Sequence, residues 1–464
     1  MNQIKNTKQL KYPMKKYFGT DGIRGKIGDD KMRPEFATLL GKVAADFCRL
    51  RKERVKILIG MDTRESGAVL SEALAKAIIS SGGSAVLAGI IPTPGLAFLT
   101  KAGDFSLGIM ISASHNDSSY NGFKLFNKEG DKLNDAEEEE MEKLIDDLSG
   151  IVSRDGNLRA KAGQTELMED ALDKYIQGLF KALPENFSAS GIKIVLDCAN
   201  GATFEVAPLV FKKIGVEIIA ICNQPDGKNI NDNCGSQHPE KLKAEVIKNG
   251  AQLGLAFDGD GDRVIAVDEK GNILNGDQLL FIFAKMLKEK GELGEIVVST
   301  QMSNLGFVRA LEKMGVGHIY TGVGDREVYE EMKRSDAVLG GEESGHIIFR
   351  SFLSNGDGIL SGLKLIEAMQ FFKKPLSELA EGIEFYPKIL LNISAKSKPE
   401  LSGFPEIENE IKAAEKALGV NGRVVVRYSG TENLCRVMVE GREKREVENY
   451  SSRIASIIEK ELNN

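Results

Sequence analysis

Short apolar segments alternate with longer amphipathic ones along most of the chain, and this alternation constrains the fold more than any other feature. The apolar segments have the length of buried strands, and the amphipathic ones have helical periodicity. The expected strands fall into three rounds, at 55–60, 84–89 and 108–112, at 192–197, 216–221 and 253–257, and at 296–300, 318–321 and 337–340. Strands that alternate with helices form βαβ units. We therefore predict three similar α/β domains with mixed, mainly parallel sheets.

The C-terminal segment follows a different order. Strands are expected at 385–393, 423–427 and 436–440, and helices at 406–418 and 446–462. This β-α-β-β-α order predicts a small α+β domain with an antiparallel sheet. Polar and turn-rich stretches then divide the chain into four expected domains, at 1–165, 166–275, 276–383 and 384–464.

The composition excludes several classes of protein. Sixty-one Lys and Arg residues against 68 Asp and Glu give a net charge of −7, which argues against electrostatic binding of nucleic acid over the whole chain. No apolar run approaches the ~20 residues of a membrane span, and the polar N-terminal segment lacks the apolar core of a secretory signal. No Cys-x-x-Cys pair occurs, so neither a disulfide framework nor a zinc site is suggested by the cysteines at 48, 198, 222, 234 and 435. We expect a cytoplasmic, multidomain protein.

The first loop with candidate reactive side chains is Ser-Ala-Ser-His-Asn at 112–116, directly after an apolar strand. Ligands gather beyond the carboxyl ends of strands in α/β sheets, so a reactive hydroxyl belongs there. His115 beside Ser114 is able to polarise or neutralise an oxyanion, and Lys124 is a further cation or base. A polar strand end with a satisfied histidine is the alternative. Gly-x-Ser-x-Gly is absent, which disfavours a hydrolase nucleophile elbow.

The second loop contains Asp258, Asp260 and Asp262, separated by glycines and followed by Arg263. Three carboxylates at alternate positions are able to turn inward around one hard cation, and without a cation they would repel one another. An EF-hand is disfavoured, because its loop requires glycine at the sixth position, where this chain has Arg263, and helices rather than strands at its flanks. Oxygen-only ligands next to a phosphate favour Mg²⁺.

Three further loops carry weaker signals. Glu342 and Ser344 in the glycine-rich segment 340–346 offer an acceptor and a donor to sugar hydroxyls, and His346 is a candidate proton-transfer group. Arg427 opens the segment 427–432, whose guanidinium, hydroxyls and glycine suit a phosphate dianion. Arg24 lies in a glycine-spaced loop at 19–25. Taken singly, the segments 340–346 and 427–432 are better interpreted as ordinary structural turns, and a turn with a solvated arginine is the alternative for 19–25.

Together, the segments 18–25, 112–116, 258–263, 341–346 and 427–432 occur in the order typical of the α-D-phosphohexomutase family, which the chain resembles over nearly its whole length. Within the family, segments 197–202, 225–231 and 234–240 resemble the branch that acts on glucosamine phosphates. The resemblance implies four domains around a central cleft, each contributing one loop. It also implies reversible conversion of glucosamine 6-phosphate into glucosamine 1-phosphate through a bisphosphate intermediate, with glucose or mannose phosphates as the alternative substrates.

The same resemblance implies roles for individual residues. Ser114 would be the phosphoserine that donates and recovers the phosphoryl group. One Mg²⁺ per chain would be held by that phosphate and by Asp258, Asp260 and Asp262. Glu342 and Ser344 would read the sugar, and the phosphate that is not transferred would bind Arg427, Ser429, Gly430 and Thr431. Phosphate contact or proton transfer would be assisted by Arg24, His115, Lys124, Arg263 and His346. A hexose 1,6-bisphosphate would act as activator.

Three positions depart from the family pattern, at Asp117, Glu327 and Asn433. Asp117 stands where proline is usual, and it is expected either to loosen the serine loop or to add a carboxylate near the metal. None of the three removes a proposed reactive group. A silent sugar-phosphate sensor and a plain phosphatase are the rival classes, and the sequence leaves monomer and homodimer open.

Overall fold

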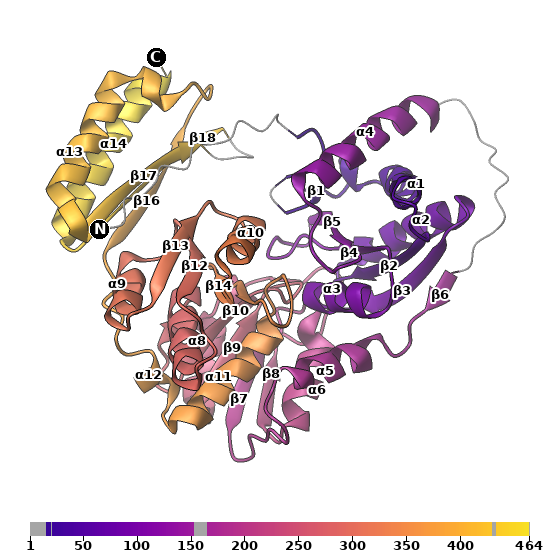
Figure 1. The fold of residues 1–464 in the computed structure, drawn as a ribbon, viewed down its shortest axis with the longest axis horizontal. Helices are drawn as coiled ribbons and strands as arrows, with labels where there is room; N and C mark the ends of the chain where they lie inside the picture. The colour runs from indigo at the N-terminus through magenta and orange to yellow at the C-terminus, as the bar shows by residue number, and fades with distance from the viewer. Residues whose placement is uncertain (1–14, 20, 153–164, 429–432, 464) are drawn as a thin grey trace.

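The computed structural model describes residues 15–19, 21–152, 165–428 and 433–463, which form four sheets flanked by helices (Figure 1). The first sheet has the strand order β1-β5-β4-β2-β3-β6. Its strands are β1 (Ile23–Lys26), β2 (Lys56–Met61), β3 (Ser84–Ile90), β4 (Leu107–Ile111), β5 (Tyr120–Asn127) and β6 (Thr165–Leu167). Its helices are α1 (Pro34–Leu50), α2 (Glu65–Ser80), α3 (Thr93–Ala102) and α4 (Asp135–Val152).

The second and third sheets have the orders β11-β10-β9-β7-β8 and β13-β12-β14-β15. The second contains β7 (Lys193–Asp197), β8 (Glu217–Ile221), β9 (Leu253–Phe257), β10 (Val264–Asp268) and β11 (Ile273–Leu274), with helices α5 (Ala171–Lys181), α6 (Thr203–Lys213) and α7 (Glu240–Asn249). The third contains β12 (Ile296–Thr300), β13 (Gly317–Thr321), β14 (Leu339–Gly341) and β15 (Ile347–Phe349), with α8 (Gly276–Lys290), α9 (Leu305–Lys313), α10 (Asp325–Ser335), α11 (Gly358–Phe372) and α12 (Leu376–Leu379).

The three sheets share one topology. In each, three parallel strands have the first of them in the centre, as in β3-β2-β4, β8-β7-β9 and β13-β12-β14. The third parallel strand is then followed by an antiparallel neighbour, β5, β10 or β15. The loops at these three hairpins contain Ser114, the aspartate triplet and Glu342. Equivalent positions in three similar domains therefore carry three of the predicted reactive segments.

The C-terminal domain is separate in construction. Its antiparallel sheet has the order β16-β18-β17, from β16 (Lys388–Ser394), β17 (Gly422–Tyr428) and β18 (Leu434–Gly441), and α13 (Pro405–Leu418) and α14 (Lys444–Asn463) lie on one face (Figure 1). The sheet and helices enclose their own apolar core, which includes Ile393, Val437 and Ile454. The predicted architecture, three mainly parallel α/β units and one α+β unit, is confirmed.

Apolar packing joins the second and third sheets more closely than the others. One continuous core extends from Tyr175 on α5 to Leu379 on α12, whereas the first sheet has a core on each of its faces. The C-terminal domain reaches the third through polar contacts: the buried Glu440 accepts from the Leu305 backbone N–H at 2.9 Å, and Arg423, which pairs with Glu440 inside the C-terminal domain, donates to the Ser303 carbonyl. The second and third domains thus form a common base to which the C-terminal domain is attached.

Two details bear on the sequence predictions. Strand β6 pairs with β3 as far as Leu167, which favours a first domain boundary after that residue rather than at 165. Within the described ranges, none of the helices combines the length and the apolar character that a membrane crossing requires.

Candidate functional site

Ser114 lies in the hairpin between β4 and β5, in a left-handed backbone conformation (φ 51°) and fully buried. Its backbone N–H donates to the Ser112 hydroxyl at 2.9 Å, and that hydroxyl donates to Asp62 at 2.6 Å. A non-glycine residue at positive φ persists only where its surroundings hold it. The loop is therefore fixed with its serine hydroxyl in a defined direction.

Two polar side chains, the buried Arg64 and the half-buried Asn231, hold the outer part of this loop. The Arg64 guanidinium pairs with Asp62 at 2.9 Å and donates to the carbonyls of Ser114 and Asn116 at 3.1 and 2.7 Å. The Asn231 amide, which comes from the second domain, donates to the same two carbonyls at 2.9 and 2.8 Å. Residues from two domains thus satisfy the backbone of one turn.

The aspartate triplet meets this serine across the domain interface. The Ser114 hydroxyl donates to Asp258 at 2.6 Å, and one carboxylate oxygen from each of Asp258, Asp260 and Asp262 lies within 4.8 Å of the others. The close approach needs glycine, because a Cβ on Gly259 would meet the Ser114 carbonyl oxygen at 2.6 Å. Burial and the two neighbouring carboxylates raise the pKa of Asp258 to about 8.

These carboxylates suit a hard cation. All three are buried, and Oδ1 of Asp260 and Oδ1 of Asp262 accept no hydrogen bond from the described residues. Unpaired buried carboxylate oxygens are costly unless a cation compensates them. An all-oxygen donor set of this kind fits a divalent metal.

Lys124 on β5 partly neutralises the triplet. Its ammonium group, 1% exposed, lies 2.7 Å from Asp260, 3.0 Å from Asp262 and 3.2 Å from Asp21. Burial opposes its charge, but the three carboxylates raise its pKa well above the usual value. Lys124 is therefore a fixed cation in this arrangement and not a free base.

His115 and two arginines lie beside the serine. His115 Nδ1 is 3.5 Å from the Ser114 hydroxyl and 3.1 Å from an Arg263 nitrogen. Burial and the charges of Arg263 and Arg24 lower the pKa of His115 to about 3, so its ring is neutral. Arg24 pairs with Asp21 and contacts the Asn116 side chain at 3.4 Å. The two guanidinium groups make this side of the serine electropositive.

His346 is brought to the triplet from the third domain. Its ring is 2% exposed, with Nδ1 3.7 Å from Asp262 and Nε2 3.4 Å from Asp325. The Gly356 backbone N–H donates to Nε2 at 2.7 Å, which places the ring proton on Nδ1. Burial opposes a second proton, whereas Asp262 and Asp325 raise the pKa, so the ring can become charged only by losing the Gly356 bond.

Glu342 and Ser344 lie in the hairpin between β14 and β15, half-buried. Burial raises the pKa of Glu342, although His346 and Arg263 act in the opposite direction. The Ser344 hydroxyl oxygen is buried without a hydrogen-bond partner among the described residues. The Ser344 hydroxyl thus retains hydrogen-bonding capacity for a polar ligand.

Arg427 is at the end of β17, in the C-terminal domain. It is paired across the sheet with Arg436 of β18. Burial and the neighbouring Arg436 charge lower the pKa of Arg427. Two guanidinium groups on facing positions form an anion-attracting pair. The predicted partners Ser429, Gly430 and Thr431 lie outside the described residues.

Several polar contacts at this site were not found by sequence reasoning. Thr93 donates to Asp260 through its hydroxyl, and Lys132 joins Asp21 to Asp325. With Arg64 and Asn231, these residues act over long chain separations and carry no local motif. The predicted effect of Asp117 is not seen, because its carboxylate accepts from the Ser119 backbone N–H at 2.8 Å and is exposed.

Comparisons with known proteins agree with this arrangement. The chain matches all four domains of the phosphoglucomutase/phosphomannomutase family: alpha/beta/alpha domain I at 15–152, alpha/beta/alpha domain II at 173–271, alpha/beta/alpha domain III at 275–386 and the C-terminal domain at 390–457. It is 47% identical to a phosphoglucosamine mutase of Syntrophus aciditrophicus, over 97% of this chain and all of that one. It is 46% identical to a phosphoglucosamine mutase of Oceanobacillus iheyensis, with the same coverage.

A solved structure shows the same fold. A phosphoglucomutase/phosphomannomutase family protein of Burkholderia thailandensis superposes with a TM-score of 0.79 at 23% identity, covering 96% of this chain and 97% of that one. All four domains match in the family's order, and the relatives have nearly the same length as this chain, so the family is assigned over the whole chain. The chain belongs to the phosphoglucomutase/phosphomannomutase family, a family of phosphohexomutases.

Proposed function

We propose that this chain interconverts glucosamine 6-phosphate and glucosamine 1-phosphate, with Ser114 carrying the phosphoryl group between the two positions. The observation that carries the proposal is the 2.6 Å hydrogen bond that joins the buried Ser114 hydroxyl to Asp258 in the aspartate triplet. The sugar is inferred from the relatives named phosphoglucosamine mutase that are 46–47% identical over nearly the full chain.

A covalent carrier suits this conversion, since a 6-phosphate does not readily reach its own 1-hydroxyl. In the first step, the substrate O1 forms a bond to phosphorus, the bond from phosphorus to the Ser114 oxygen breaks, and the hydroxyl proton ends on that oxygen. In the second step, the Ser114 oxygen forms a bond to the phosphorus of the 6-phosphate, the bond from that phosphorus to O6 breaks, and the Ser114 proton ends on O6. Over both steps no proton is gained or lost.

The residues around Ser114 support this role. Arg64 and Asn231 hold the serine turn. The guanidinium groups of Arg24 and Arg263 supply positive charge on one side of the hydroxyl, and the neutral His115 ring lies beside it. Such pre-oriented charge stabilises the phosphoryl group in the transition state of its transfer. Lys124 supplies a fixed ammonium against the triplet. His346 is proposed to orient Asp262 and to assist proton movement.

We further propose that Asp258, Asp260 and Asp262, with a phosphate on Ser114, hold one Mg²⁺. A bound divalent cation would neutralise charge on the transferring group. Arg427, supported by Ser429, Gly430 and Thr431, is proposed to bind the phosphate that is not transferred, and Glu342 and Ser344 to bind sugar hydroxyls. The proposal includes activation by a hexose 1,6-bisphosphate, a monomer or homodimer, and a cytoplasmic location.

The test is Ser114→Ala, with Ser118→Ala on the same loop as the matched control. Ser114→Ala should reduce mutase turnover to background with the thermal midpoint retained, and Ser118→Ala should remain active. Intact-mass measurement should find one phosphoryl group on the wild type and on Ser118→Ala, and none on Ser114→Ala. Near-normal turnover by Ser114→Ala would refute the nucleophile assignment.

Sugar specificity has its own test. The wild type should show a higher kcat/KM for glucosamine 6-phosphate than for glucose 6-phosphate or mannose 6-phosphate. A preference for either neutral sugar would make the chain a phosphoglucomutase or phosphomannomutase. Release of inorganic phosphate without isomerisation would identify a phosphatase instead.

A further inference from the structure

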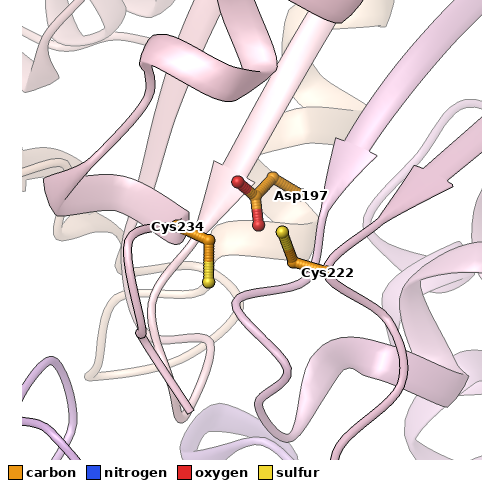
Figure 2. A group of neighbouring side chains, drawn as sticks. All are labelled: Asp197, Cys222 and Cys234. Atoms are coloured by element: carbon orange, nitrogen blue, oxygen red, sulfur yellow. The ribbon is translucent and has the colours of Figure 1, made fainter. Parts of the chain in front are cut away.

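Cys222 and Cys234, which are far from any Cys-x-x-Cys spacing, lie together at one edge of the second sheet (Figure 2). Cys222 directly follows β8, and Asp197 is the last residue of the neighbouring parallel strand β7. Cys234 precedes the short 3-10 helix Gly235–Gln237. A ligand atom from each of the three side chains lies within 4.8 Å of the others.

Backbone hydrogen bonds fix this cluster. The Asn200 N–H donates to the Cys222 carbonyl at 2.6 Å. The Asp197 carboxylate accepts from the backbone N–H groups of Ala199 and Gly235, at 2.9 and 3.0 Å. Asp197 therefore ties the Cys234 segment to the end of β7 through Gly235 and fixes, through Ala199, the turn whose Asn200 holds Cys222. The residue pair is positioned by the fold and not by sequence proximity.

The two thiols have different surroundings. Cys222 is half-buried, and the Lys241 ammonium donates to its sulfur at 3.3 Å. Cys234 is 1% exposed, and its thiol is hydrogen-bonded to Cys222, which lowers the pKa of Cys222 and raises that of Cys234. The isolated Cys48 and Cys435 differ, because burial raises their pKa values to about 12 and about 11. Only a thiolate is a good sulfur nucleophile.

We propose that Cys222 and Cys234 are a modification site that forms a reversible disulfide on reaction with a hydroperoxide. Cys222 is the attacking residue, since it is accessible and faces an ammonium group, and Cys234 is the resolving residue beside it. A divalent metal is a poorer occupant, because the Lys241 ammonium already contacts one sulfur and both Asp197 oxygens accept backbone bonds.

The chemistry balances in two steps. The Cys222 thiolate attacks one peroxide oxygen, the O–O bond breaks, and a sulfenic acid and hydroxide form. The Cys234 sulfur then attacks the Cys222 sulfur, the S–O bond breaks, and water leaves with the thiol proton. The two thiols lose two electrons in total, and the peroxide gains them. An external dithiol reduces the disulfide back to the two thiols and is itself oxidised to a disulfide.

The pair is connected to the serine loop, and this part of the inference rests on the proposed function. The two cysteines are at the ends of a loop that contains Asn231, whose amide donates to the Ser114 and Asn116 carbonyls. The Asn231 backbone N–H also donates to Ala199 at 2.9 Å, beside Asp197. Disulfide formation draws Cys234 towards Cys222 and displaces the segment that holds Asn231. Oxidation should therefore lower turnover.

The chemical test needs no substrate. The reduced full-length protein is treated with hydrogen peroxide, free thiols are alkylated after denaturation, and peptides are mapped by mass spectrometry. The expected product is a Cys222–Cys234 linked peptide that dithiothreitol removes, with Cys48, Cys198 and Cys435 still alkylated. Cys234→Ser should accumulate a sulfenic acid at Cys222 that dimedone traps. Absence of the linked peptide in the wild type, or retention of a stoichiometric zinc ion by the pair, would overturn the proposal.

Two variants on α7 test the ammonium contact. Lys241→Met should slow peroxide oxidation of Cys222 at least threefold, whereas Lys243→Met, exposed on the same helix, should leave the rate unchanged. Equal rates in both variants would overturn the role of Lys241. Peroxide should lower wild-type mutase turnover severalfold and reversibly, and leave Cys222→Ser unaffected. A mapped disulfide with unchanged turnover would overturn the connection to the serine loop. Failure of the proposed function is distinguished from this outcome, because the enzyme would then lack mutase turnover before any peroxide is added.

Discussion

Replacing the buried Asp277 with asparagine should stabilise the third domain at alkaline pH and have little effect in acid. Asp277 is in the first turn of α8, 0% exposed, with one oxygen accepting from the Asn304 backbone N–H at 2.7 Å. Its other oxygen has no hydrogen-bond partner among the described residues. Burial, aided by the Glu343 charge and opposed by the Asn304 bond, raises the pKa of Asp277 from 3.8 to about 7.

The size of the effect follows from this shift. Each pKa unit corresponds to about 1.4 kcal/mol, so a shift from 3.8 to about 7 costs the folded state roughly 4 kcal/mol once Asp277 is ionised. Because the folded-state pKa is the higher one, the folded protein binds the proton more tightly. The free energy of unfolding is therefore undiminished by Asp277 below about pH 4. It falls as the pH rises towards 7 and then levels off. Asparagine keeps the acceptor for Asn304 and removes the charge.

Thermal unfolding between pH 5 and pH 8 is the assay. The stabilisation by Asp277→Asn should grow by roughly 2–3 kcal/mol over this range, which raises the midpoint of the affected transition by about 5 °C or more relative to wild type. Asp173→Asn, exposed in the first turn of α5, is the matched control and should show no such trend. An Asp277→Asn difference that is the same at pH 5 and pH 8 would refute the reasoning.

Three other changes should have separable effects. Chelation of divalent metal should abolish mutase turnover and added Mg²⁺ should restore it; full rates in metal-free buffer would contradict the role of the aspartate triplet. Arg64→Lys should lower the thermal midpoint by several degrees, since a lysine cannot make the contacts of the buried guanidinium with Asp62 and two loop carbonyls; an unchanged midpoint in calorimetry would count against this. Arg427→Met should raise KM for the sugar phosphate about tenfold or more, as expected for loss of a charged hydrogen bond, with a smaller change in kcat; steady-state kinetics with an unaltered KM would exclude Arg427 from phosphate binding.

The central parallel strands, such as β4, β9 and β12, were predictable because both of their faces are buried, which makes them short continuous apolar runs. The expected strands at 253–257 and 296–300 coincide with β9 and β12. Strand β14 begins at Leu339 and not at 337, because the turn after α10 extends two residues further. Strand β5 was not predicted, although it contains Lys124. Its sequence, Tyr-Asn-Gly-Phe-Lys-Leu-Phe-Asn, interrupts the apolar pattern with buried polar residues whose partners are distant in the chain, as Asp21 and Asp260 are for Lys124.

The site was predictable where its residues occur in compact motifs and not where they act across domains. Ser114 and the aspartate triplet were found from local spacing, and the structure brings them into contact. Asn231 and Arg64 were missed, because a single amide or guanidinium gives no sign of which distant carbonyls it will contact. Cys222 and Cys234 were also missed as a pair, since their proximity depends on the ends of β7 and β8.

The shared hairpin topology has a mechanical consequence. Each of the loops after β4, β9 and β14 is tied at both ends to neighbouring antiparallel strands, through pairs such as Ile111 with Phe123 and Phe257 with Val264. A loop held at both ends in this way has little freedom to travel relative to its own sheet. Any separation of these loops that admits or releases a sugar must then come from rigid rotation of whole domains, with the hinges located in the linkers between them.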